Sequence, residues 1–170
     1  VGGTRHALAC AKAMEAGCFH HVSSIAAAGL YKGTFTEDMF EEATGLDNPY
    51  YRTKHDAEGL VRREEGIPWR IYRPGVVVGH SATGEMDKID GPYYFFPAIR
   101  QVGNALPGWL RAIMVQGGTI NIVPVDFVVD AMDCLMHARG QNGKTFFLTK
   151  TKGITNSDLM RVLLKAPHGP

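Results

Sequence analysis

The stretch Phe19-His20-His21-Val22-Ser23-Ser24-Ile25-Ala26-Ala27-Ala28-Gly29 decides how this sequence folds. Its residues 19–26 form a short, largely apolar run, which predicts a buried strand that ends in small residues. Ser23 and Ser24 lie near the end of this strand, where hydroxyl groups could reach a ligand. The rest of the chain has to be interpreted around this strand end.

Strands and helices alternate on both sides of this stretch. We expect one helix from Thr4, its cap, to about Ala16, and a second from Asn48-Pro49 to Glu65. Further strands are expected at 69–78, 119–125 and 144–149, and Pro74-Gly75 predicts that regular pairing in the first of them ends there. Other predictions are a loop over 31–47 with a helical turn at 37–43, a helix capped by Asp126, and a last helix from Asn156 or Ser157.

This alternation predicts an α/β fold with a mostly parallel sheet and flanking helices. In such sheets, ligands bind beyond the carboxyl ends of the strands. The candidate functional residues should therefore follow the strands directly, as Ser23-Ser24 and the turn after Pro74 do.

The composition is that of an ordinary soluble chain: 170 residues, 45% hydrophobic and 21% charged, with a formal net charge of +1. The apolar content excludes a disordered chain, and the balanced charge gives no reason to expect nucleic acid as a partner. No apolar run approaches the ~18 residues of a transmembrane helix. Three separated cysteines without a Cys-x-x-Cys pair favour a reducing, cytoplasmic compartment, and the seven histidines form no metal-binding pattern.

Tyr50 and Lys54 form a Tyr-x-x-x-Lys pair on the helix that follows the Ser-Ser strand end. Residues four apart lie on one helical face, so the ammonium group favours the phenolate form of the tyrosine through opposite charge. Such a tyrosine can give a proton to a carbonyl oxygen as hydride arrives, and a serine hydroxyl can orient the same oxygen. By itself the pair is weak evidence, because about 0.3 chance matches are expected in a chain of this composition.

Taken together, the Ser-Ser strand end, the Tyr50/Lys54 pair and a strand ending Arg73-Pro74-Gly75 resemble the extended short-chain dehydrogenase/reductase family. The chain is most similar to its bacterial fatty acyl-CoA reductases, a thioester reductase-like group of the NAD-dependent epimerase/dehydratase superfamily. The stretches that carry this similarity are 20–29, 37–43, 52–55, 84–88, 90–96 and 121–126. The resemblance runs from about Val1 to about Thr149 and implies a Rossmann-like, doubly wound sheet.

Carried over by this resemblance, the catalytic residues are Ser24, Tyr50 and Lys54, with Ser23 as the second choice of hydroxyl. The implied cofactor is NADPH or NADH, without a metal. Its contacts would be Ser23, Tyr50, Lys54, Pro74, Gly75 and Val76, and the last three correspond to the segment whose backbone approaches the nicotinamide carboxamide. The implied substrate is a fatty acyl-CoA or a fatty aldehyde, and the substrate-binding candidates are Tyr93, Tyr94, Phe95, Phe96 and Trp109.

One departure from the family concerns the start of the chain. The Gly-rich phosphate loop is absent, and Val1-Gly2-Gly3-Thr4 resembles the start of the helix that follows the family's fourth strand. We therefore expect residues 1–170 to be the C-terminal portion of a larger reductase domain, with a substrate-binding segment at about 80–118. Alone, this portion is expected to be inactive and to bind a dinucleotide weakly.

The same residues are compatible with other substrates and with a function other than catalysis. The runner-up keeps the fold and takes a sugar nucleotide or a hydroxysteroid as substrate, and a third hypothesis is a non-catalytic nucleotide-binding module. The aromatic cluster 93–96 could be core, while Trp109 could line an acyl channel or touch a membrane surface. Arg73 is interpreted as a structural residue that pairs near the end of the sheet.

Overall fold

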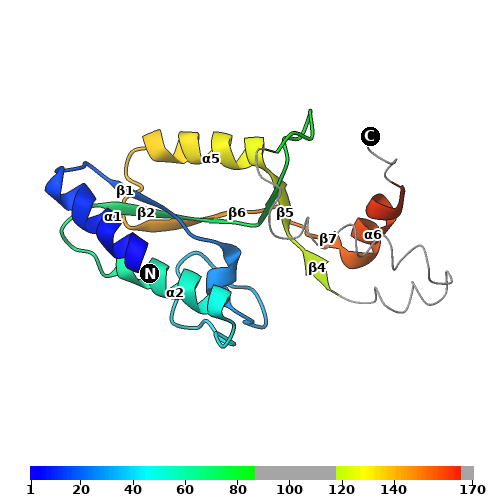
Figure 1. Ribbon diagram of the computed structural model, residues 1–170, viewed down its shortest axis with the longest axis horizontal. Helices are drawn as coiled ribbons and strands as arrows, with labels where there is room; N and C mark the ends of the chain where they lie inside the picture. The colour runs from blue at the N-terminus through cyan, green and yellow to red at the C-terminus, as the bar shows by residue number, and fades with distance from the viewer. Residues whose placement is uncertain (87–117, 166–170) are drawn as a thin grey trace.

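The fold is described by a computed structural model for residues 1–86 and 118–165 (Figure 1). Its centre is a parallel sheet in the order β1-β2-β6, formed by β1 (Phe19–Val22), β2 (Trp69–Pro74) and β6 (Lys144–Leu148). β3 (Val76–Val78) pairs in parallel with β5 (Ile122–Pro124). β4 (Thr119–Ile120) pairs antiparallel with β7 (Ile154–Thr155).

Helices cover both faces of this sheet. α1 (Gly2–Ala13) and α2 (Pro49–Arg62) lie on one face, and α5 (Val125–His137) lies on the other (Figure 1). A short 3-10 helix, η1 (Ile25–Ala28), follows β1, and α6 (Asn156–Lys165) follows β7. The predicted fold class, a mostly parallel sheet with flanking helices, is confirmed. Within the described ranges, no helix has both the length and the apolar composition needed to cross a membrane.

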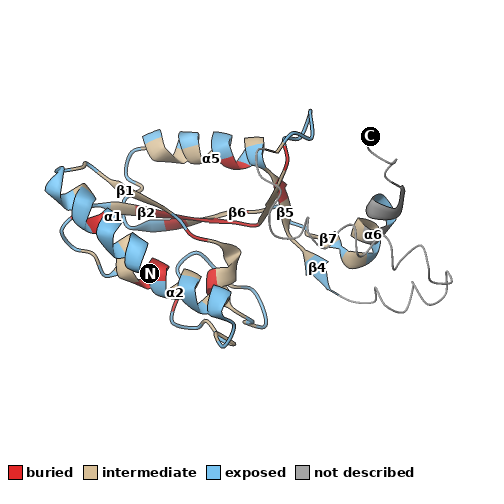
Figure 2. Ribbon diagram, viewed as in Figure 1, coloured by how far each residue is buried: buried red, intermediate tan, exposed pale blue. Residues whose placement is uncertain are grey.

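The alternation of side chains along β2 builds a core on each face of the sheet. Ile71 packs with Leu8, Val61 and Ile67 under α1 and α2. The next residue, Tyr72, points to the other face and packs with core residues under α5, which are Val123, Val128 and Leu148. The buried positions accordingly follow β2 through the middle of the molecule (Figure 2). The consecutive residues Ile71 and Tyr72 thus belong to the cores on opposite faces of the sheet, as expected for a central strand that is covered on both faces.

At Pro74-Gly75 the chain stops pairing with β6 and begins to pair with β5. β2 is paired with β6 as far as Pro74, and the Gly75 N–H then donates to the Leu148 carbonyl at 3.2 Å. The Val76 N–H donates instead to the Asn121 carbonyl at 2.7 Å, at the start of the pairing with β5. A Cβ atom on Gly75 would lie 2.6 Å from that carbonyl oxygen, so a glycine is needed for this approach. The predicted end of regular pairing is confirmed.

Several predicted boundaries near the N-terminus are wrong. α1 begins at Gly2 with Val1 in the capping position, so Thr4 is a helical residue and not the cap. β1 ends at Val22 and does not reach Ala26, because the Ser24 hydroxyl oxygen accepts the Ala26 N–H at 3.1 Å and begins η1. Residues 37–43 form turns and bends without a helix.

Two predictions in the second half also need correction. The expected strand 119–125 is divided at Asn121 into β4 and β5, which pair with different strands. Pro124 occupies the capping position of α5, and Asp126 lies in the first turn of that helix. The Asp126 carboxylate is used elsewhere, because it accepts the N–H of Ser81 at 2.9 Å and its hydroxyl at 2.6 Å.

Candidate functional site

Tyr50 and Lys54 lie in the first turns of α2, on one side of the helix. Asn48 and Pro49 start this helix as predicted, and the Asn48 side-chain oxygen accepts the Tyr50 N–H at 2.9 Å. The Lys54 ammonium lies 6.0 Å from the centroid of the Tyr50 ring, and the Tyr50 side chain is 54% exposed. Within residues 1–86 and 118–165, neither the tyrosine hydroxyl nor the ammonium group has a hydrogen-bond partner. Both groups are therefore available to a ligand.

The two serines after β1 are used in different ways. Ser23 is buried, and its hydroxyl donates to Oε2 of Glu58 at 2.7 Å, so its proton is already engaged. Ser24 is half-buried and its oxygen accepts a hydrogen bond from the backbone of the turn that it caps. An accepting hydroxyl still has its own proton to donate. Of the two candidates, Ser24 is the one that can donate a hydrogen bond to a ligand oxygen.

η1, which Ser24 caps, packs directly against α2. A ring nitrogen of His55 lies 3.0 Å from the Ala27 carbonyl oxygen, which joins the two elements one residue beyond Lys54. The His55 ring also stacks on Phe40, with a centroid separation of 4.1 Å. The structure therefore places the turn that begins at Ser24 and the helix of Tyr50 and Lys54 on adjoining elements at the carboxyl end of β1.

The third predicted segment, Pro74-Gly75-Val76, lies at the carboxyl end of β2, next to β1 in the sheet. Proline has no N–H, and the N–H groups of Gly75 and Val76 both donate to carbonyl oxygens of neighbouring strands. A hydrogen bond from this segment to a nicotinamide carboxamide would thus need one of its carbonyl oxygens as acceptor. Pro74 and Gly75 are buried, and Val76 is half-buried.

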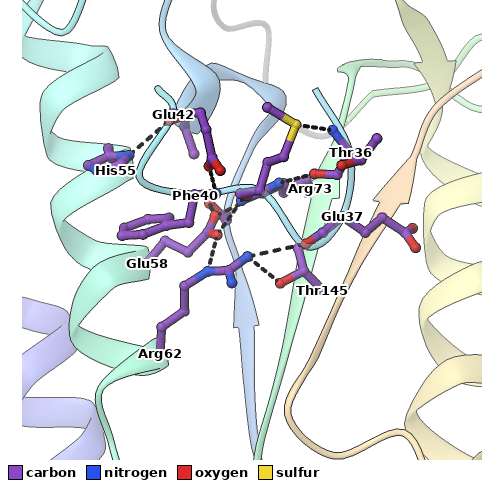
Figure 3. A network of polar contacts seen from close by, with 12 residues as sticks. Thr36, Glu37, Phe40, Glu42, His55, Glu58, Arg62, Arg73 and Thr145 are labelled. Carbon is purple, nitrogen blue, oxygen red and sulfur yellow. Dashed lines mark hydrogen bonds and ion pairs between the residues drawn. The ribbon is translucent and has the colours of Figure 1, made fainter. Parts of the chain in front are cut away.

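A buried carboxylate that the sequence did not single out lies behind these residues. Glu58 has no exposed surface, and its two oxygens contact Arg73 at 2.7 and 3.2 Å, Arg62 at 2.9 Å and Ser23 at 2.7 Å (Figure 3). Burial by itself would raise the pKa of Glu58. The hydrogen bonds and charge of Arg73, with further hydrogen bonds from Ser23 and Arg62, hold that pKa below its ordinary value.

Arg73 extends this network to the loop between η1 and α2. Its guanidinium group donates to the carbonyl oxygens of Thr36 at 3.3 Å and Met39 at 2.8 Å (Figure 3). It also lies 5.0 Å from the Phe35 ring and 5.1 Å from the Phe147 ring. The interpretation of Arg73 as a structural residue near the end of the sheet is confirmed, and its ion-pair partner is Glu58.

A pocket of about 530 Å³ lies beyond the carboxyl ends of β5 and β6. It is lined by Pro124, Phe127, Thr149, Lys150, Thr151 and Lys152. Its loop is fixed at Lys150, whose N–H and carbonyl both bond the side-chain amide of Asn121, at 2.9 and 2.7 Å. Among the described residues, the lining combines an apolar wall with two lysines and contains no acidic side chain. The predicted substrate residues Tyr93, Tyr94, Phe95, Phe96 and Trp109 lie outside the described residues.

Histidine, cysteine and carboxylate side chains do not gather into a metal site in the described part of the chain, where no group of three or more could hold an ion. His20 lies 2.9 Å from the Tyr72 hydroxyl and stacks on its ring. Burial lowers the pKa of both His20 and His21. These histidines take part in packing at β1.

Comparison with known families gives one match that covers most of the chain. The model of the NAD-binding family described as male sterility protein matches residues 1–132. This range includes the Ser24 turn, the Tyr50/Lys54 helix and the Pro74-Gly75 strand end.

Known proteins similar to this chain include large biosynthetic enzymes and a reductase domain. A non-canonical nonribosomal peptide synthetase, FrzA of a Cladobotryum species, is 29% identical over 99% of this chain and 17% of its own length. L-2-aminoadipate reductase of Saccharomyces cerevisiae is 34% identical over 55% of this chain and 6% of its own length. The crystal structure of the terminal R domain from the myxalamid PKS-NRPS pathway has a TM-score of 0.76 at 25% identity. That match covers 95% of this chain and 40% of the R domain chain.

Proposed function

Because the chain belongs to the male sterility protein family of NAD-binding domains, we propose that it carries the proton-transfer residues of a nicotinamide-dependent reductase. The proposed substrates are fatty acyl thioesters, such as fatty acyl-CoA, and fatty aldehydes. The observation that carries this proposal is the set of unengaged donors at the end of β1: the Tyr50 hydroxyl, the Lys54 ammonium and the Ser24 proton.

These donors fit a nicotinamide cofactor, NADPH or NADH, which would supply the hydride. Lys54 has a free ammonium group on the face of α2 that carries Tyr50, and it would donate to ribose hydroxyls. Ser24 and Tyr50 would both hydrogen-bond the carbonyl oxygen of the substrate, and Tyr50 would give it a proton as its negative charge develops. Lys54 would favour this transfer by stabilising the phenolate that Tyr50 leaves behind.

With a thioester, the same residues would act twice. Addition of one hydride and one proton to the thioester gives a hemithioacetal, which releases the thiol and leaves an aldehyde. Addition of a second hydride and a second proton to the aldehyde gives the alcohol. In each round Tyr50 would hand its proton to the substrate oxygen and would have to be reprotonated before the next.

The pocket beyond β5 and β6 supports a carrier thioester that bears phosphate. Lys150 and Lys152 line it, the lining residues that the structure describes include no acidic one, and a phosphate group would neutralise the charge of the lysines. CoA and phosphopantetheine both join phosphate to a pantetheine arm, and Pro124 and Phe127 provide apolar lining for the methyl and methylene groups of that arm. A free fatty aldehyde has no phosphate and would not use the lysines.

The test is an assay of the full-length protein that contains this sequence. Oxidation of NADPH, and separately of NADH, is measured with a long-chain fatty acyl-CoA and with a fatty aldehyde. Conversion of a UDP-sugar in the presence of NAD⁺ is followed by product analysis, because an epimerase or dehydratase leaves the cofactor unchanged overall. We expect turnover with the first two and none with the sugar nucleotide, and loss of turnover in Tyr50→Phe. A protein that turns over only the UDP-sugar, or whose fatty acyl activity survives Tyr50→Phe, would overturn the proposal.

A further inference from the structure

Glu58 lies on the same side of α2 as the proposed proton donor. It follows Lys54 by four residues and Tyr50 by eight, so the three side chains form one row along the helix. The exposed fraction falls along this row, from 54% at Tyr50 to none at Glu58. Tyr50, at one end of the row, is therefore exposed to solvent, and Glu58, at the other end, is buried against the sheet.

The Glu58 carboxylate connects α2 to the ends of two neighbouring strands. It accepts a hydrogen bond from Ser23, the residue directly after β1, and two from Arg73, the next-to-last residue of β2. Each partner is adjacent in sequence to a candidate site residue, because Ser23 precedes Ser24 and Arg73 precedes Pro74. One side chain thus links the three segments that carry the proposed site.

The chemistry of the Glu58 ion pair suits a role in orienting α2 better than a role in stabilising the fold. A buried ion pair contributes little net stability compared with well-packed apolar side chains, since both charges must leave water. A carboxylate held by a guanidinium fork is, however, strongly directional. Glu58 receives one hydrogen bond from Ser23 and two from Arg73, and these three join α2 to the strand ends, while a fourth comes from Arg62 of the same helix.

We propose that Glu58 is a positioning residue, which holds α2 so that Tyr50 and Lys54 face the oxygen that Ser24 orients. This inference rests on the proposed function, because it concerns the geometry of that proton transfer. Misplacement of a reacting group by about 1 Å can lower a rate by about 10²-fold. Loss of the carboxylate should therefore act on the chemical step and leave the binding of substrate nearly unchanged.

The test compares Glu58→Gln with Glu64→Gln in the full-length protein. Glu64 lies just beyond α2, where its carboxylate forms an ion pair with Lys12 at 3.0 Å and accepts the Gly66 N–H; within the described residues it forms no hydrogen bond or ion pair with the carboxyl ends of the strands. We expect Glu58→Gln to lower kcat at least 10-fold with KM changed less than about threefold. Glu64→Gln should keep both constants. A folded Glu58→Gln protein with a lower melting temperature but the kcat of the wild type would overturn the proposal.

A second measurement does not depend on activity. Hydrogen exchange of the backbone amides in η1 and in the first turns of α2 should become at least 10-fold faster in Glu58→Gln and stay unchanged in Glu64→Gln. If the wild type reduces none of the substrates, the proposed function fails, and unchanged exchange in Glu58→Gln would overturn the positioning role separately. Should Glu58→Gln not accumulate, Glu58→Asp retains the charge and shortens the reach. The same fall in kcat and faster exchange are expected, and wild-type values for both would refute the role.

Discussion

The hydroxyl of Ser23 donates a 2.7 Å hydrogen bond to the buried carboxylate of Glu58. This bond separates the roles of two adjacent serines, because the Ser23 proton is engaged and the Ser24 proton is free. It also links the proposed proton-transfer site to the buried polar network behind it.

The two serines should respond differently to replacement by alanine. Ser24→Ala should lower kcat about 10²-fold, because one of the two groups that hold the substrate oxygen is lost. Ser23→Ala should chiefly lower the free energy of unfolding, by about 1–3 kcal/mol, because Glu58 loses a buried donor. Steady-state kinetics and urea unfolding of both variants check this. A larger fall in kcat for Ser23→Ala would reverse the assignment.

Tyr50→Phe removes the proposed proton donor and keeps the ring. We expect turnover to fall by about 10²–10⁴-fold, the usual range for a general acid, while the melting temperature changes little because the side chain is half-exposed. Tyr51→Phe is the matched control, because it changes the neighbouring residue on a different side of the helix. Equal losses of turnover in Tyr50→Phe and Tyr51→Phe would contradict the assignment of Tyr50 as the proton donor.

The acid stability of the protein should depend on Glu58. Its pKa is lowered in the folded state, so its contribution to stability is complete above the ordinary glutamate value of about 4.3 and decreases as pH falls toward the lowered value. The charged groups that face it are Arg73 and Arg62. Burial lowers the pKa of nearby His21, so its protonation also destabilises the folded state in acid.

Urea unfolding of the wild type and of Glu58→Gln, measured from about pH 6 to about pH 3, tests this dependence. The variant should lose less stability over this range than the wild type, because it has no carboxylate to protonate at this position. The charge of Glu58 raises the pKa of His21, so the contribution of His21 would differ between the two proteins, and both are therefore measured in a His21→Gln background. Parallel curves for the two proteins would contradict the prediction.

Gly29, at the end of η1, should tolerate no side chain. Its φ is +63°, and a Cβ atom would lie 2.0 Å from the Thr44 carbonyl oxygen. We expect Gly29→Ala to lower the free energy of unfolding by more than about 1 kcal/mol, through backbone strain and a clash with backbone. Gly3→Ala, in α1 with open space around it, should instead raise it by about 0.5–1 kcal/mol. Thermal or urea unfolding measures both.

The lysines of the pocket allow a test of the substrate class. In the Lys150→Ala, Lys152→Ala double variant of the full-length protein, KM for fatty acyl-CoA should rise about 10-fold. KM for the fatty aldehyde of the same chain length should stay constant, because the aldehyde has no phosphate. Steady-state kinetics with both substrates provide the measurement. An equal rise for the two substrates would show that the lysines do not recognise a phosphate group.

Parts of the fold with strong local signals could be predicted from the sequence. Asn48-Pro49 starts α2 because the asparagine oxygen accepts a free N–H and proline fits the first helical position. Pro74-Gly75 ends the pairing of β2 because proline has no N–H and glycine allows close approach. Asn48 and Pro49 act on the helix that they begin, and Pro74 acts through its missing N–H, so their effects can be predicted without knowledge of a distant partner.

Other features depend on contacts between distant segments. Glu58 has the sequence context of a solvated helical residue, and its burial follows only when Arg73 and Ser23 meet it from two strands. β7 has two residues, which is too short for any periodic pattern, and it is defined by its antiparallel pairing with β4. The sequence predicts that Asp126 caps α5, but its carboxylate accepts hydrogen bonds from the N–H and the hydroxyl of the distant Ser81 instead.

The parallel sheet also bears on how fast the chain can fold. β2 is the central strand, and its Arg70 is paired with His20 on one side and with Lys144 on the other. Neither pairing is local, so each requires closure of a long loop before any ladder hydrogen bond can form. We expect α2 and β2 to organise with β1 early, and β6 to add last. Folding should therefore be slow compared with that of a helical protein of the same length.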